Sequence, residues 1–93
     1  MTTQPFEAVR TDRKHQPPYK VLLHNDDLNS MDHVIQALLK TLPQLTTGRA
    51  REIMFEAHTS GVALVIVTHR EPAEFYQESL QLQGLTVTLE PAE

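Results

Sequence analysis

The chain has 93 residues, 40% of them hydrophobic, which limits it to one small domain with a single core. Its formal net charge of −4 argues against general nucleic-acid binding, and the lack of cysteine excludes disulfides, thiol chemistry and thiolate metal sites. No apolar run approaches the roughly 20 residues of a membrane span, and no secretory signal is recognisable. We therefore expect a soluble cytoplasmic domain with no membrane partner, and the plastid stroma is the alternative compartment.

The first 18 residues mix Thr, Gln, Pro and charged side chains with few apolar groups. Arg10, Arg13, Lys14 and His15 make this segment locally positive, and the pair Pro17–Pro18 disfavours a helix. Such a composition predicts a mobile arm over residues 1–18 and a folded domain over residues 19–93. The arm either contacts a partner or is simply solvated.

A β-rich run from Tyr19 to His24 has the length of a strand, and a polar turn follows it over residues 25–30. Apolar residues then recur with the period of a helix, at Met31, Val34, Ile35, Leu38, Leu39 and Leu42. Asn29 is the expected N-cap of this helix, and Pro43 stops it.

A second helix is expected after a cap at Thr46 or Thr47, with Gly61 at its C-terminal end. Its apolar stripe combines Ala50, Ile53, Met54, Ala57 and His58. The continuous apolar run from Val62 to Thr68 has the length of a strand and is typical of a central one.

A third helix is expected to open at Glu71–Pro72, with Pro at its first position, and to end at Gly84. Phe75, Tyr76 and Leu80 would form its apolar face. Leu85, Val87 and Leu89 alternate with polar residues, as in a half-exposed last strand. The order β-α-α-β-α-β predicts a compact α+β domain, a three-stranded antiparallel sheet with three helices on one face.

The turn after the first strand is unusually polar, with Asn25, Asp26, Asp27, Asn29 and Ser30 in six residues. Two carboxylates and side-chain amides beside apolar walls suit a small cation or an amine. The simpler alternative is that these residues only make the turn and cap the helix.

Three residues of the helical stripes could serve this turn. His58 is expected to be half-buried, where an imidazole makes one directed hydrogen bond, or to be a satisfied core histidine. Met31 and Met54 are either core residues or the adaptable lining of a pocket.

A metal site is a weaker hypothesis. His24 and His33 flank the acidic turn, but no His-x-x-x-His pair occurs in the sequence. The turn also fails the EF-hand pattern, because Met31 stands where an oxygen ligand is required and the central Gly is missing. No phosphate-binding loop, nucleophile elbow or HExxH motif is present. We expect no metal and no cofactor, and a metal-dependent hydrolase stays a minor alternative.

Three motifs together resemble the ClpS family: the run from Tyr19 to Asp27, then Met31-Asp32-x-Val34, then Glu56-Ala57-His58-x-x-Gly61. The resemblance covers about residues 18–90 and is strongest to cyanobacterial and plastid members, whose chaperone is ClpC. It implies an adaptor, not an enzyme. Such an adaptor binds N-degron substrates by their free α-amino group and a large first residue (Leu, Phe, Tyr or Trp) and delivers them to a Clp AAA+ chaperone–protease.

The resemblance also implies roles for residues. Asn25, Asp26 and His58 would hold the amine. A hydrophobic pocket for the first side chain would be lined by Met31, Val34, Met54, Ala57 and Leu85, with Asp27 and Asn29 at its rim. Glu71 would dock on the N-terminal domain of a ClpC- or ClpA-type chaperone.

Three residues depart from the pattern of many family members. Asn29 stands where many carry Thr, and Ala57 stands where many carry Val or a larger residue, so the side-chain preference is open. Tyr76 falls where some members have Lys, so the docking surface can differ. The alternative function is a Clp chaperone regulator with no or altered N-degron binding.

Overall fold

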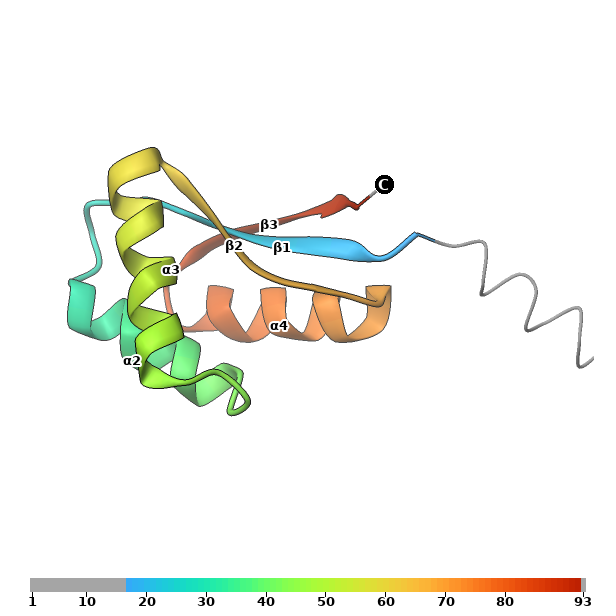
Figure 1. The fold of residues 1–93 in the computed structure, drawn as a ribbon, viewed down its shortest axis with the longest axis horizontal. Coiled ribbons are helices and arrows are strands. Elements are labelled where there is room, and N and C mark those ends of the chain that lie inside the picture. Colours follow the sequence, from blue (N-terminus) through green and yellow to red (C-terminus); the bar gives the residue numbers. More distant parts are fainter. Residues whose placement is uncertain (1–16, 93) are drawn as a thin grey trace, which may run out of the picture.

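The structure is a computed structural model that describes residues 17–92 (Figure 1). The predicted order and α+β class are confirmed. The elements are β1 (Tyr19–His24), α2 (Met31–Thr41), α3 (Thr47–Ser60), β2 (Val62–Thr68), α4 (Arg70–Leu82) and β3 (Thr86–Pro91). The mobile arm predicted for residues 1–18 lies outside the described residues, except for its last two.

The three strands form one antiparallel sheet in the order β2-β1-β3, so β1 is the central strand. Leu23 of β1 pairs with Ala63 on one side and with Val87 on the other. The prediction that Val62–Thr68 is central is therefore wrong. In this edge strand Ala63 and Val65 are buried, whereas Leu64 is 36% exposed. The apolar run was misleading because apolar side chains occupy both faces of β2, and the described residues leave its outer face uncovered.

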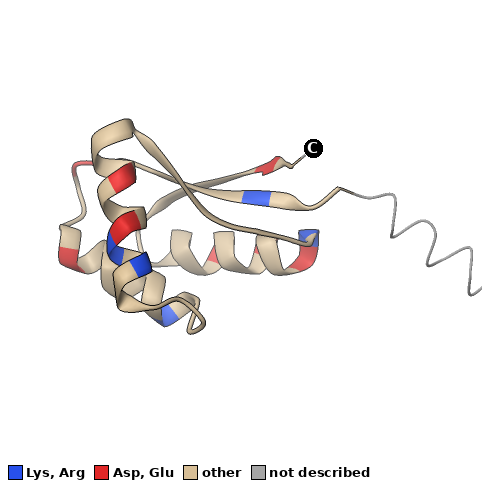
Figure 2. Ribbon diagram, in the orientation of Figure 1, with Lys and Arg blue, Asp and Glu red and all other residues tan. Residues whose placement is uncertain are grey.

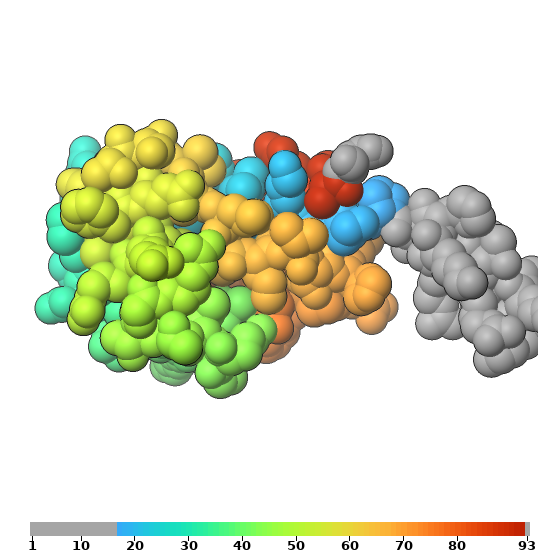
Figure 3. All heavy atoms as spheres, viewed as in Figure 1, coloured from blue at the N-terminus to red at the C-terminus, as the bar shows by residue number. Residues whose placement is uncertain are grey.

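The helices cover one face of the sheet (Figure 1). Helix α4 packs along the strands, α3 packs on β2 and β1, and α2 packs on the other two helices. Figure 3 shows α3 in yellow-green and α4 in orange over much of one face of the molecule. The core lies between sheet and helices, and its largest fully buried side chains are Leu38, Leu42, Ile53, Leu80, Val21 and Val87.

The helix ends correct one prediction and confirm two. Ser30, not Asn29, is the N-cap of α2, and its hydroxyl accepts a hydrogen bond from the backbone N–H of His33 at 3.1 Å. Asn29 is instead engaged with the turn that precedes the helix. Thr46 caps α3, and Gly61 ends it with a φ of +91°, a conformation that favours glycine.

Helix α4 begins two residues earlier than the sequence predicted. His69 is its N-cap and Arg70 its first residue, so Pro72 lies at the third helical position, where no intrahelical N–H donor is lost. Phe75 is 60% exposed and does not belong to the apolar face. Ala73 is buried instead, on the same stripe of α4 as Leu80 two helical turns later.

Charges of both signs are interspersed over the described residues (Figure 2). Two ion pairs, Arg49–Glu52 at 3.2 Å and Arg70–Glu74 at 3.1 Å, lie on exposed helix surfaces. The hydrogen bond and the charge of Glu74 raise the pKa of Arg70. None of the helices described between residues 17 and 92 has the length and apolar character needed to cross a bilayer.

Candidate functional site

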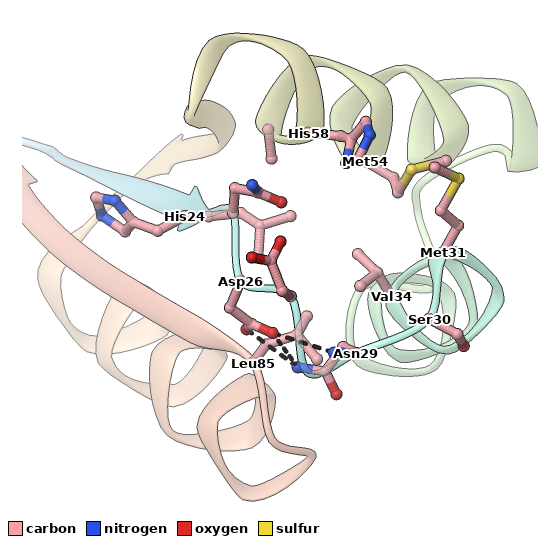
Figure 4. A pocket seen from close by; sticks show the side chains of 13 residues that line it. His24, Asp26, Asn29, Ser30, Met31, Val34, Met54, His58 and Leu85 are labelled. Atoms are coloured by element: carbon pink, nitrogen blue, oxygen red, sulfur yellow. Dashed lines mark hydrogen bonds between the residues drawn. The ribbon is translucent and has the colours of Figure 1, made fainter.

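A cavity of about 250 Å³ opens where β1 ends, between the starts of α2 and β3 and the last turns of α3 (Figure 4). Its position follows from the fold, because the polar turn leaves the central strand between the first turn of α2 and the last turns of α3. The lining residues are Leu23, His24, Asn25, Asp26, Asp27, Asn29, Ser30, Met31, Val34, Met54, Ala57, His58 and Leu85.

All ten residues predicted for the amine site, the pocket and its rim line this one cavity. Their individual roles stay predictions. The sequence analysis missed Leu23, His24 and Ser30 as lining residues. Leu23 could have been found as the last inward-facing residue of the strand, and Ser30 as a capping residue of the helix next to the turn.

One side of the cavity, the apolar wall, consists of Met31, Val34, Met54, Ala57 and Leu85. Met54, Ala57 and Leu85 are buried, with 7%, 3% and 4% of their surfaces exposed. Met31 is 46% exposed, as its place at the start of α2 requires. Figure 4 shows the side chains of Met31 and Met54 pointing toward one another across the gap between α2 and α3. Two flexible thioethers therefore border one side of the apolar pocket.

The other side, the polar wall, consists of Asn25, Asp26, Asp27, Asn29 and His58. Within it, Asp26 and Asn29 are bound to each other: the amide Nδ2 of Asn29 lies 3.0 Å from each carboxylate oxygen of Asp26 (Figure 4). Oδ1 of Asp26 also accepts the backbone N–H groups of Leu28 at 3.0 Å and Asn29 at 3.1 Å. This carboxylate thus folds the turn around itself, as an Asx turn does.

The remaining polar-wall side chains, those of Asn25, Asp27 and His58, have no hydrogen-bond partner among residues 17–92. The backbone N–H of Asn25 donates to the carbonyl of Gly61 at 3.0 Å, which ties the turn to the end of α3 that carries His58. His58 is exposed, so the expectation of a half-buried side chain is wrong. In a helix, residue 58 is rotated about 100° from Ala57 and falls beyond the edge of the buried stripe.

The two histidines that flank the turn are used elsewhere. The ring of His24 points away from the cavity, and its Nε2 lies 2.7 Å from Oγ1 of Thr88 (Figure 4). Nε2 of His33 lies 2.6 Å from the backbone carbonyl of Gln83, to which it donates. Residues 17–92 contain no group of three or more His, Asp or Glu that could hold a metal ion.

The predicted docking residue is remote from the cavity. Glu71 lies in the first turn of α4 and is exposed, whereas the cavity lies at the other end of that helix, next to Leu85 (Figure 1). Tyr76, on the same helix, accepts a hydrogen bond from Nε2 of Gln44 at 3.3 Å and packs edge-on against Phe75.

Comparison with known proteins gives relatives over nearly the whole chain. The ATP-dependent Clp protease adapter protein ClpS of Gloeobacter violaceus is 53% identical over 91 residues, 98% of each protein. The chloroplastic adapter protein CLPS1 of Chlamydomonas reinhardtii is 48% identical over 90 residues, which are 97% of this chain and 56% of that protein.

A solved structure and a family profile agree with these relatives. The structure of Agrobacterium tumefaciens ClpS2 bound to L-phenylalaninamide superimposes with a TM-score of 0.79 at 30% identity, covering 84% of this chain and 100% of that chain. The profile of the family "ATP-dependent Clp protease adaptor protein ClpS" matches residues 14–88. These matches confirm the resemblance found in the sequence: the chain belongs to the ClpS family of Clp protease adaptors.

Proposed function

We propose that this adaptor binds the N-terminus of N-degron substrates in the cavity after β1 and delivers them to a Clp AAA+ chaperone–protease. The observation that carries the proposal is one cavity in which hydrogen-bonding groups without partners among the described residues adjoin a buried apolar wall. A free protein N-terminus has matching chemistry, an ammonium group next to a side chain. The relative that was solved with L-phenylalaninamide carries such a ligand, a free amine beside an aromatic side chain.

The polar wall suits the ammonium group. Asp26 and Asp27 supply negative charge, and the side-chain carbonyl of Asn25 supplies a directed acceptor. His58 faces the same cavity from the last turn of α3 and can bond the amine or the first peptide group. Charge-assisted hydrogen bonds are about twice as strong as neutral ones, so this wall would distinguish a free amine from a blocked one.

The apolar wall suits a large first side chain. Burying a Leu or Phe side chain against Met54, Ala57 and Leu85 gains about 1.5–3 kcal/mol relative to leaving it in water. Ala57 leaves more room than the larger residue found in many family members. We propose Leu, Phe, Tyr and Trp as the accepted first residues.

Delivery requires a second contact, which we place away from the cavity. Glu71 would dock on the N-terminal domain of a ClpC- or ClpA-type chaperone, with Tyr76 altering that surface relative to members that carry Lys. Because α4 separates Glu71 from the cavity, one molecule can hold substrate and chaperone together. The cyanobacterial and chloroplastic relatives support the cytoplasm or the plastid stroma as the place of action.

The test is binding of a fluorescent Leu-initiated peptide and of the same peptide with an acetylated amine. Acetylation removes the charge and adds bulk, so affinity should fall at least about tenfold, or 1.4 kcal/mol. A peptide that starts with Asp serves as the control for the first side chain. Equal binding of free and acetylated peptides would exclude an amine site. A protein that binds a Clp chaperone but none of the peptides would support the alternative, a chaperone regulator.

A further inference from the structure

Two connections far apart in the sequence are joined beside the cavity. The amide Nδ2 of Asn29, in the turn after β1, donates to the backbone carbonyl of Gly84 at 2.8 Å. The hydroxyl of Thr86 donates back to Oδ2 of Asp26 at 3.3 Å. Asn29 thus reaches both the carboxylate of Asp26 and the connection between α4 and β3, an arrangement we call the Asn29 bridge.

The bridge, together with donors from Leu28 and Thr86, fills the hydrogen-bonding capacity of Asp26. Oδ1 accepts from the N–H of Leu28, the N–H of Asn29 and Nδ2 of Asn29, and Oδ2 accepts from Nδ2 of Asn29 and from Thr86. A carboxylate offers about four lone-pair sites. These five contacts leave Asp26 little capacity for a direct bond to a ligand, so it acts on an ammonium group mainly through its charge.

The other end of the bridge sets the apolar wall. Gly84 adopts a φ of +91°, and the next residue, Leu85, is 4% exposed and lines the cavity. A backbone bond from the N–H of Leu85 to the carbonyl of Leu80 at 3.1 Å holds this residue from the helix side. The contact of Asn29 with Gly84 holds it from the turn side. The distance between charge and apolar wall therefore depends on this amide, together with the weaker bond from Thr86 to Asp26.

We propose that Asn29 is a positioning residue that determines which first side chains the cavity accepts. It fixes the polar turn, which carries Asn25, Asp26 and Asp27, relative to Leu85, and thus fixes the depth of the pocket below the amine. The direct contacts to the amine then fall to Asn25, Asp27 and His58, the polar side chains that have no partner within the described part of the chain. The inference rests on the proposed function.

The test variant is Asn29→Asp, because the side chain of Asp has nearly the same shape as that of Asn. It replaces the Nδ2 donor with an acceptor that faces three other acceptors, the two oxygens of Asp26 and the carbonyl of Gly84, so the bridge is lost. Asn29→Thr is the second variant in case the first does not fold, because a hydroxyl donates only one bond and can keep only one arm. Thr46→Ala is the control: it removes a side-chain cap of α3 outside the cavity lining and costs stability without touching the bridge.

The first readout needs no ligand. In methyl NMR spectra of the free protein, Asn29→Asp should shift the Leu85 methyl resonances, and the backbone amide of Leu28 should exchange faster. Thr46→Ala should leave both unchanged. Unchanged Leu85 and Leu28 signals in a folded Asn29 variant would show that the bridge positions nothing.

The second readout is affinity for Leu-, Phe- and Trp-initiated peptides. A released Leu85 should deepen the pocket, so the Trp-to-Leu affinity ratio should rise at least about threefold in Asn29→Asp and less in Asn29→Thr. A merely structural residue would weaken all three peptides by the same factor, as Thr46→Ala would. An unchanged ratio overturns the selectivity role. If wild type binds none of the peptides, the proposed function fails and the selectivity role with it, while the NMR readout still decides whether the bridge exists.

Discussion

The two walls of the cavity are held in place by different forces. The polar wall is held by the hydrogen bonds between Asp26 and Asn29 in the turn after β1, and all five of its residues are partly or fully exposed. The apolar wall is part of the domain core, where Met54, Ala57 and Leu85 are buried together with the residues that stabilise the fold. A change in the polar wall can therefore alter binding in a folded protein. A change in the apolar wall alters binding and core packing together.

The largest loss of binding is expected from the polar wall. Asp26→Ala removes a negative charge, and it leaves the groups that now donate hydrogen bonds to Asp26 without their acceptor. Leu-peptide affinity should therefore fall at least about tenfold, or 1.4 kcal/mol. Thermal unfolding should also report a loss of about 1–3 kcal/mol, because several hydrogen bonds disappear.

Asp32→Ala is the matched control for this prediction. It removes the same charge from the first turn of α2, at a residue that does not line the cavity. Calorimetric titration of both variants separates a local role from the net charge. An Asp26 variant that binds like the Asp32 variant would contradict the charge role of the polar wall.

The two walls also differ in how far the sequence predicted them. Period and spacing placed Met31, Val34, Met54 and Ala57 on helices that face one core, because burial imposes a helical period. The same reasoning failed for His58, one residue beyond the stripe.

Residues of the turn were harder to place. The sequence indicated Asn29 as the helix cap, but Ser30 takes that role and Asn29 binds Asp26 and Gly84. Asn and Ser are both good caps, so only the three-dimensional neighbours decide between them. The contact with Gly84 joins residues 55 positions apart, and no local pattern predicts it.

The edge position of β2 could not be predicted for a similar reason, because it depends on contacts between distant parts of the chain. An apolar run predicts burial on both faces, but only one face of this strand lies under helices. Strand order depends on which pairs form across the chain, and the run itself carries no information about its partners.

An intermediate loss of peptide affinity is expected when a residue of the apolar wall is changed. Ala57→Val adds two methyl groups to the surface of α3 that lines the pocket, and crowding of this kind costs about 1–3 kcal/mol. Phe- and Trp-initiated peptides should lose more affinity than a Leu-initiated one, because they need the most room. Fluorescence anisotropy with the three peptides measures the order.

Ala50→Val tests whether that loss is only a packing defect. Ala50 is fully buried in the same helix but does not line the cavity. The two variants should be similarly destabilised in thermal melts, while only Ala57→Val changes the order of the peptides. If Ala50→Val changes it equally, the apolar wall cannot be treated as a pocket distinct from the core.

The smallest change in peptide affinity is expected at Met31, where the two walls meet. If the polar wall fixes the amine, it also fixes the Cα and Cβ atoms of the first residue. Leu and the aromatic residues carry one heavy substituent at Cβ, whereas Ile and Val carry two. Met31 is the first residue of α2, directly after the polar turn, and its side chain points toward Met54, so it is placed to crowd the second branch (Figure 4). Met31→Ala should raise affinity for Ile- and Val-initiated peptides by a few-fold, on the order of 1 kcal/mol.

Stability should hardly change in this variant, because Met31 is 46% exposed and leaves no enclosed cavity behind. Affinity for the Leu-initiated peptide should stay equal or weaken slightly, since that side chain gains no room at Cβ and loses one contact. Met31→Leu is the control, because it keeps an apolar side chain of similar volume and should keep the wild-type preference. Anisotropy titrations with Leu, Ile, Val and Phe peptides give the ratios. If wild type binds Ile and Leu alike, or if Met31→Ala leaves their ratio unchanged, Met31 belongs to the apolar wall without controlling access to it.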